Sequence, residues 1–84
     1  MDIIWSGNEM GQKIRYYRLK RKLSQKALAK AVGVSVYRIR LMESGEIREA
    51  DATVFMALCQ ALNVEMEVMT NAEVRPGSSV YNDF

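Results

Sequence analysis

Residues 24–45, SQKALAKAVGVSVYRIRLMESG, constrain the fold of this 84-residue chain more than any other stretch. A serine precedes each of two apolar-periodic segments, at Ser24 and Ser35. A serine side chain in that place caps the first amide groups of a helix. Gly33 lies between the segments, where glycine permits the left-handed backbone of a tight turn. The pattern predicts two short helices, over about 25–31 and 36–44, joined by a turn.

The second predicted helix has two different faces. Ile39 and Met42 are spaced to point into a core. The positions left facing outward are Val36, Tyr37, Arg38, Arg40 and Leu41. This is the layout of a helix-turn-helix, in which the second helix enters the major groove of DNA.

The same stretch closely resembles the lambda-repressor-like (Xre/Cro) family, whose pattern is SQ-x-x-LA-x-x-x-GVS-x-x-x-I-x-x-x-E-x-G. Every position is filled at the right spacing, by Ser24, Gln25, Leu28, Ala29, Gly33, Val34, Ser35, Ile39, Glu43 and Gly45. The resemblance implies sequence-specific binding to double-stranded DNA. It also implies a phosphate contact by Gln25, the alternative being a solvent-exposed glutamine beside a cap.

Family positions that approach base edges fall on Ser35, Val36, Tyr37 and Leu41, and Arg38 and Arg40 flank them. Arginine reads guanine through two hydrogen bonds, whereas Val, Leu and Tyr contact thymine methyl groups or sugars. The surface is therefore less polar than is usual in the family, and we expect DNA shape to contribute more to readout. The alternative for Tyr37 and Leu41 is that they cover the core.

The family often pairs an arginine of the first helix with the glutamate that ends the third, and Arg18 and Glu43 occupy these positions. A bidentate, partly buried pair would fix the recognition helix against the first helix, and Arg18 would also reach a phosphate. Other candidates for phosphate contacts are Lys20, Arg21, Lys22, Lys26 and Arg48. We expect two or three of them to bind, since most charge runs are solvated faces.

Charge is distributed unevenly along the chain. Residues 1–50 carry eleven Lys and Arg against five Asp and Glu, a net charge of +6, whereas residues 51–84 carry −4. A basic half that contains the helix-turn-helix is typical of a nucleic-acid binder. The acidic half is expected to face a protein partner.

The elements around the motif complete an all-α fold of four helices. A first helix is predicted over 8–20, capped by Ser6, and a fourth over 52–62, capped by Asp51, with a polar connection over 45–50. Strict alternation over Val64–Val68 predicts a short C-terminal β-strand that pairs across a homodimer through Val64, Met66 and Val68. The predicted organisation is a DNA-binding domain over 1–63, a dimerisation strand over 64–70 and a flexible tail over 71–84.

Ile4-Trp5-Ser6 before the first helix, the predicted strand and a tail ending in an aromatic residue resemble the HipB-type antitoxins. The resemblance implies a cytoplasmic homodimer that represses its own operon from a palindromic operator and binds a HipA-like kinase toxin. Two alternatives are an ordinary small repressor without a toxin and a protein-interaction module with weak DNA binding.

Other functions have little support in the sequence. The chain has no His and one cysteine, Cys59, which falls on an apolar helix face. No metal-ligand spacing is present, so we expect neither catalysis nor a cofactor. No apolar run approaches the length of a membrane span, and we expect no membrane partner.

Overall fold

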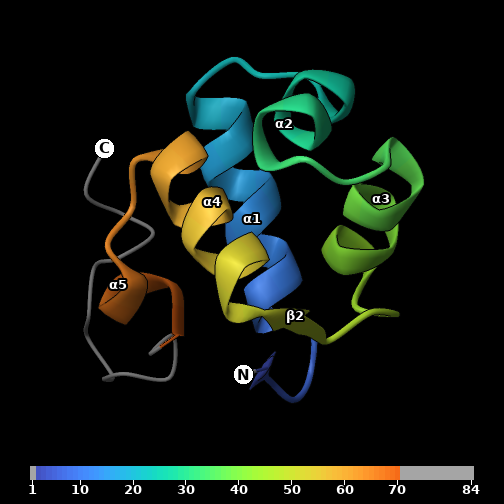
Figure 1. The fold of residues 1–84 in the computed structure, drawn as a ribbon, viewed down its shortest axis with the longest axis vertical. Helices are drawn as coiled ribbons and strands as arrows, with labels where there is room; N and C mark the ends of the chain where they lie inside the picture. The colour runs from blue at the N-terminus through green and yellow to red at the C-terminus, as the bar shows by residue number, and fades with distance from the viewer. Residues whose placement is uncertain (1, 71–84) are drawn as a thin grey trace.

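The computed structural model describes residues 2–70, with Thr70 described by its backbone alone. Five helices and two short strands follow one another along this part of the chain (Figure 1). In chain order they are β1 (Asp2–Ile4), α1 (Glu9–Lys20), α2 (Gln25–Val32), α3 (Val36–Ser44), β2 (Glu49–Asp51), α4 (Ala52–Leu62) and α5 (Met66–Thr70). The predicted bounds of the third and fourth helices agree with those of α3 and α4.

The helices enclose one apolar core. Helices α1 and α4 run through the middle of the molecule, with α2 and α3 on one side and α5 on the other (Figure 1). The centre of the core is fully buried and consists of Ile14, Leu28, Ile39, Met42, Phe55 and Leu62. Each of the four longer helices contributes to this set, and burial of such side chains stabilises a domain by roughly 1.5–3 kcal/mol apiece.

Gly11 explains how closely α1 and α3 pack. A Cβ atom at this position would lie 2.7 Å from the carbonyl oxygen of Glu43, with the carbonyl oxygen of Met42 nearer still. Real side chains do not approach backbone oxygens so closely. The missing side chain therefore lets the last turn of α3 rest directly on α1.

The first helix begins differently from the prediction. Asn8, and not Ser6, is the residue that precedes α1, and its side chain makes no capping hydrogen bond. Gly7 has a positive φ of 68° and separates Ser6 from the helix. The serine therefore lies too far back to cap the helix.

The predicted strand over 64–70 is wrong. Residues Met66–Thr70 form α5, and Met69 is buried in the same core as the other helices. Val64 precedes the helix, Met66 is 45% exposed, and Val68 packs partly against the core. These side chains therefore form no pairing face of a strand, and Met69 packs in the core cluster with residues of the preceding helices.

Lys13 is a tertiary partner that favours a helix here. Its ammonium group is fully buried on α1 and donates hydrogen bonds to the carbonyl oxygens of Val68 and Met69, the latter at 3.3 Å. These carbonyls lie at the end of α5, where a helix leaves acceptors unsatisfied and a positive charge is favourable. A tertiary contact thus overrides the local alternation of apolar and acidic residues.

The described residues form a two-stranded sheet elsewhere, between the N-terminal segment and the residues just before α4. β1 pairs antiparallel with β2, with Ile3 opposite Ala50 and Ile4 opposite Glu49. The sheet departs from the all-α prediction, which assigned residues 45–50 to a polar connection. The predicted tail, 71–84, lies outside the described residues. Within the described part, no helix is long and apolar enough to cross a membrane.

Candidate nucleic-acid interface

Caps and left-handed residues delimit α2 and α3 at both ends. The Ser24 hydroxyl accepts a hydrogen bond from the amide of Ala27 at 2.9 Å, and the Ser35 hydroxyl accepts one from the amide of Arg38 at 3.1 Å. Gly33 and Gly45 end the two helices, both at φ of 87°. A left-handed residue at a helix C-terminus favours glycine, so the turn between α2 and α3 is specified locally.

One face of α3 is open to solvent. Ile39 and Met42 are fully buried, whereas Tyr37 is 63% exposed. Ser35 and Arg40 are also exposed, and the side chains half-buried beside them are Val36, Arg38 and Leu41. The exposure of Tyr37 is inconsistent with the alternative that it covers the core. Leu41 is half-buried, so its exposure fits both a groove-facing side chain and one that covers the core.

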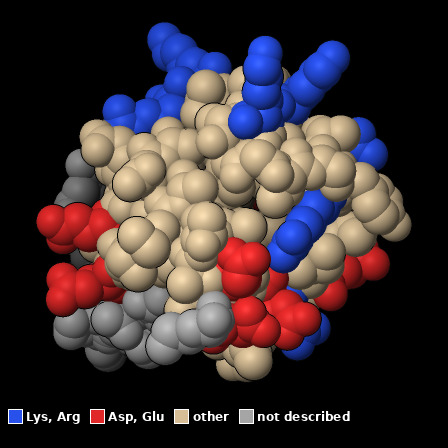
Figure 2. Space-filling model, viewed as in Figure 1, with Lys and Arg blue, Asp and Glu red and all other residues tan. Residues whose placement is uncertain are grey.

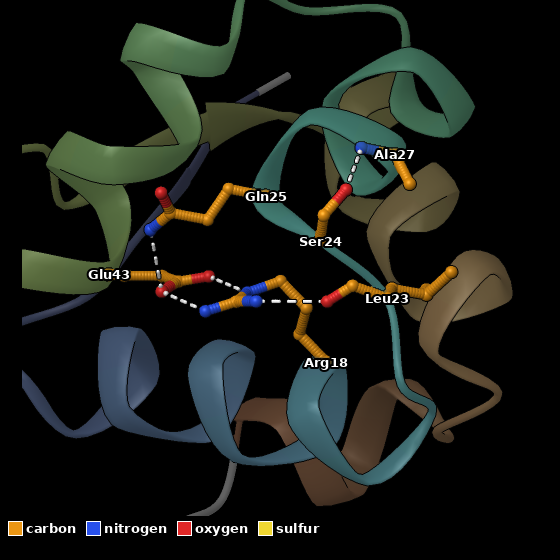
Figure 3. A network of polar contacts seen from close by, with 6 residues as sticks. All are labelled: Arg18, Leu23, Ser24, Gln25, Ala27 and Glu43. Carbon is orange, nitrogen blue, oxygen red and sulfur yellow. Dashed lines mark hydrogen bonds and ion pairs between the residues drawn. The ribbon is translucent and has the colours of Figure 1, made fainter.

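The buried end of α3 is held by a network of charged hydrogen bonds (Figure 3). The Arg18 guanidinium donates from Nε to Glu43 Oε2 at 2.6 Å and from Nη2 to Glu43 Oε1 at 3.1 Å. Its Nη1 donates to the carbonyl of Leu23 at 2.9 Å, and the Gln25 amide donates to Glu43 Oε1 at 3.1 Å. The Arg18 and Glu43 side chains are only 8% and 4% exposed. The network therefore ties α1, the start of α2 and the end of α3 together.

This arrangement bears on two of the predicted DNA contacts. Arg18 is 6% exposed and three of its nitrogens donate within the protein. Gln25 is half-buried, with its amide directed at Glu43 rather than at solvent (Figure 3). Of these two side chains, Gln25 is the one that retains exposed surface from which to reach a phosphate.

The remaining basic candidates differ in their surroundings. Lys26 is exposed on α2, and Lys22 is exposed just after α1. Arg21 donates from Nε to the carbonyl of Leu62 at 3.1 Å, where it caps the end of α4. Arg48 donates from Nε to the carbonyl of Gly45 at 2.7 Å and stiffens the connection after α3. All four keep exposed surface, so internal bonding does not remove them from solvent.

Opposite charges gather on opposite edges of the molecule. Figure 2 shows Lys and Arg side chains projecting from the edge formed by α2 and the loop before it. Asp and Glu gather at the other end, around β2 and the region of α5 (Figure 2). Because α2 packs against α3, this basic edge places positive charge next to the recognition helix.

Three structural contributions were not predicted from the sequence. Lys13 and Gly11 sit on α1 without a local pattern to mark them, since their roles depend on α5 and α3. The strand β1 pairs with a partner 45 or more residues away. Among the residues the structure describes, no group of three or more His, Cys, Asp or Glu could hold a metal ion.

Comparison with known proteins agrees with this geometry. A family described as "Helix-turn-helix" matches residues 14–69. The chain belongs to the helix-turn-helix family. The match covers all of α2, α3 and α4.

The solved structures that resemble this member of the family include the P22 c2 repressor bound to a synthetic operator, at a TM-score of 0.68. That repressor is 36% identical, over 73% of this chain and 91% of the other. SinR, the master regulator of biofilm formation, in complex with DNA, has a TM-score of 0.67 at 22% identity, over 71% of this chain and 95% of SinR. The similarity to SinR shows the fold alone.

A third similar structure is the restriction-modification controller protein C.AhdI from Aeromonas hydrophila. Its TM-score is 0.66 at 27% identity, over 71% of this chain and 89% of the other. A search of curated protein sequences found no match.

Proposed function

We propose that the chain is a sequence-specific DNA-binding transcriptional repressor that acts as a homodimer on a palindromic operator. One observation carries the proposal: α3 exposes its N-terminal face to solvent while its opposite end is locked to α1 by the Arg18–Glu43 pair. A rigid helix with an open face, next to a basic edge, is what major-groove reading requires. The likeness to the operator-bound P22 c2 repressor supports the same function.

The proposed contacts divide into two groups. Base edges would be approached from α3, by Ser35, Val36, Tyr37, Arg38, Arg40 and Leu41. Phosphates would be bound by Gln25, Lys26 and Arg48, which flank that helix. Arg18 has its donors turned inward, and we assign it the role of positioning α3 and Gln25 rather than a DNA contact.

The experiment that tests the proposal is selection of binding sites from random duplex DNA, followed by affinity measurements on the selected site. Tyr37→Ala should weaken specific binding by roughly 1–3 kcal/mol, because it removes an exposed side chain of α3. Met66→Ala is a matched control, since Met66 is also exposed but lies on α5, on the other side of the molecule (Figure 1). Failure to enrich any sequence would contradict the proposal.

Two further variants separate base contacts from phosphate contacts. Arg38→Ala should relax preference at one base pair in a panel of single-base operator variants if Arg38 reads a base. Lys26→Ala should weaken all sequences alike and reduce the salt slope by about one. A salt-independent affinity of the unsubstituted protein would favour the interaction-module alternative.

The antitoxin hypothesis has lost one of its supports. It depended partly on a dimerising strand over 64–69, where the structure has α5. A kinase toxin partner remains a prediction from the Ile4-Trp5-Ser6 lead, the tail and the acidic half. Purification of the native protein from its source cells, with mass spectrometry of co-purified proteins, tests it. A stoichiometric kinase would support the prediction, and DNA without such a partner would contradict it.

A further inference from the structure

The strand β1 has one edge paired and one edge open. The amide of Trp5 donates to the carbonyl of Arg48 at 2.9 Å, which continues the β1–β2 ladder by one residue. In an antiparallel ladder, hydrogen-bonded and non-hydrogen-bonded pairs alternate, so Ile4 and Glu49 form a non-hydrogen-bonded pair. The amide and carbonyl of Ile4 therefore point away from β2. No other strand of the described residues lies along that edge.

The side chains of this segment differ strongly in their exposure to solvent. Ile4 is 72% exposed, the highest exposure of any large apolar side chain in residues 2–70. Its neighbours Ile3 and Trp5 turn the other way and pack against the core. An exposed isoleucine beside an unpaired strand edge is an association site that soluble proteins ordinarily block.

The polarity of this segment reads the same in both directions. Asp2-Ile3-Ile4-Trp5-Ser6 is polar, apolar, apolar, apolar and polar, with Ile4 at the centre. If two copies align antiparallel about Ile4, each Ile4 faces the partner's Ile4, each Ile3 faces the partner's Trp5, and Asp2 faces the partner's Ser6. Apolar side chains therefore face apolar ones, and polar side chains face polar ones, at every cross-strand pair. Such pairs stabilise neighbouring strands.

Pairing about Ile3 instead lacks this agreement. In that register the exposed Ile4 would lie against the partner's Asp2. The sequence of the segment thus specifies one register and one occupant, a second copy of the same strand. A two-fold axis requires such a self-complementary surface.

We propose that the open edge of β1 is the dimer interface of this protein, in which two copies join as a continuous four-stranded sheet, β2–β1–β1–β2, centred on Ile4. The inference rests on the proposed function, since it supplies the two-fold axis that a palindromic operator requires. Residues 45–48 are all that separate the end of α3 from β2, so the sheet would join the two reading helices through short connections.

Ile4→Pro tests the interface with little effect on the protomer. Proline removes the Ile4 amide, which faces the partner and not β2, and proline is tolerated where the missing amide points outward at an edge strand. Two equivalent hydrogen bonds are lost across the axis, so the dissociation constant of the dimer should rise about tenfold or more in sedimentation equilibrium. A proline at another exposed apolar position is no suitable control, because Leu19→Pro would break α1. The matched comparison is therefore between Ile4→Thr and Leu19→Thr. Both remove an exposed apolar side chain, and Ile4→Thr alone should weaken the dimer.

Disulfide trapping tests the register. With Ile4 opposite the partner's Ile4, the Cα atoms lie about 5.5 Å apart, within the range that a disulfide spans. Ile4→Cys should therefore cross-link on mild oxidation. Asp2→Cys, on the same face of the same strand, should not, because its partner lies roughly 14 Å away along the strand. Cys59 is buried and does not compete.

The outcomes distinguish the interface from the DNA-binding proposal. Sedimentation and cross-linking are measured without DNA and again on the selected operator. A dimer that Ile4→Pro leaves unchanged, or equal cross-linking of both cysteine variants, overturns the β1 interface and leaves DNA binding untouched. A protein that stays monomeric both free and on DNA also overturns it. A dimer broken by Ile4→Pro that still binds a single half-site supports it.

Discussion

Helices α3 and α5 are both short and pack against the same core, but they are held in different ways. α3 has a serine cap, a left-handed glycine at its end, two fully buried side chains and the Arg18–Glu43 pair. α5 has five residues, one of which, Met69, is fully buried, together with the carbonyl bonds from Lys13. An isolated helix of this length is unstable in water, so α5 depends on its tertiary contacts.

The difference shows how stability is distributed in the fold. Helix α3, which presents an open face, is fixed by local caps and by a buried network. Its outward side chains are therefore not needed to hold it in place. The shorter helix α5 is held at two points, the buried Met69 and the carbonyl bonds from Lys13. We therefore expect changes near α3 to affect the whole domain, and changes near α5 to loosen one edge first.

Loss of the buried carboxylate should have the largest effect. Glu43→Gln leaves the Arg18 guanidinium buried without its counter-charge, so the free energy of unfolding should fall by about 3–5 kcal/mol in urea denaturation. Glu46→Gln is the control, because Glu46 is exposed and lies just after α3, three residues from Glu43. A loss from Glu43→Gln no greater than that from Glu46→Gln would mean that the pair does not anchor α3.

Truncation of the α5 anchor should have the next largest effect. Met69→Ala leaves a cavity against the core, and partial collapse of this edge should hold the loss to about 2–3 kcal/mol. Met66→Ala, on the same helix but 45% exposed, should change stability by less than about 0.5 kcal/mol. Hydrogen exchange should show α5 amides losing protection before those of α3. Equal loss of protection in both helices would contradict the contrast.

The same contrast explains what the sequence could predict. Ser24, Ser35, Gly33 and Asp51 act on residues within one helical turn, so the bounds of α2, α3 and α4 follow from local chemistry. The Arg18–Glu43 pair lies 25 residues apart and was expected through the family resemblance rather than through any local signal. The exposed residues of α3 follow in turn from its buried ones, because helical periodicity places both.

The segments predicted incorrectly are those whose structure depends on contacts with residues far away in the sequence. Val64–Val68 alternates like a strand, but the burial of Met69 and the charge of Lys13 favour a helix. β1 is too short for its own pattern to show, and its pairing depends on β2. Two residues between Ser6 and α1 were enough to misplace the first cap.

Removal of the α3 cap should have a smaller effect. Ser35→Ala leaves the amide of Arg38 without its acceptor, and the free energy of unfolding should fall by about 1 kcal/mol. Ser44→Ala, at the exposed far end of the same helix, is the control and should stay within about 0.5 kcal/mol. A loss above 3 kcal/mol would indicate that the cap, and not the buried network, fixes α3.

The smallest effect concerns Cys59, which changes reactivity rather than stability at neutral pH. Burial raises the pKa of its thiol from 9.0 to about 11, so little thiolate exists at pH 8. The native protein should react slowly with iodoacetamide, and the urea-unfolded protein at the rate of a free thiol. Because the folded-state pKa is the higher one, the stabilisation is fully present below pH 9 and is lost as the pH rises towards 11.

Cys59 also reports on α5, because it lines a pocket together with Val64, Met66 and Glu67, the residues that lead into and begin that helix. If α5 opens as a separate unit, Met69→Ala should accelerate alkylation of Cys59 under conditions in which the rest of the domain stays folded. Glu43→Gln, compared at the same stability in mild urea, should accelerate it only through global unfolding. Equal acceleration by both variants would mean that α5 unfolds together with α3. The domain would then unfold as one cooperative unit, with no separate opening of α5 at lower free energy.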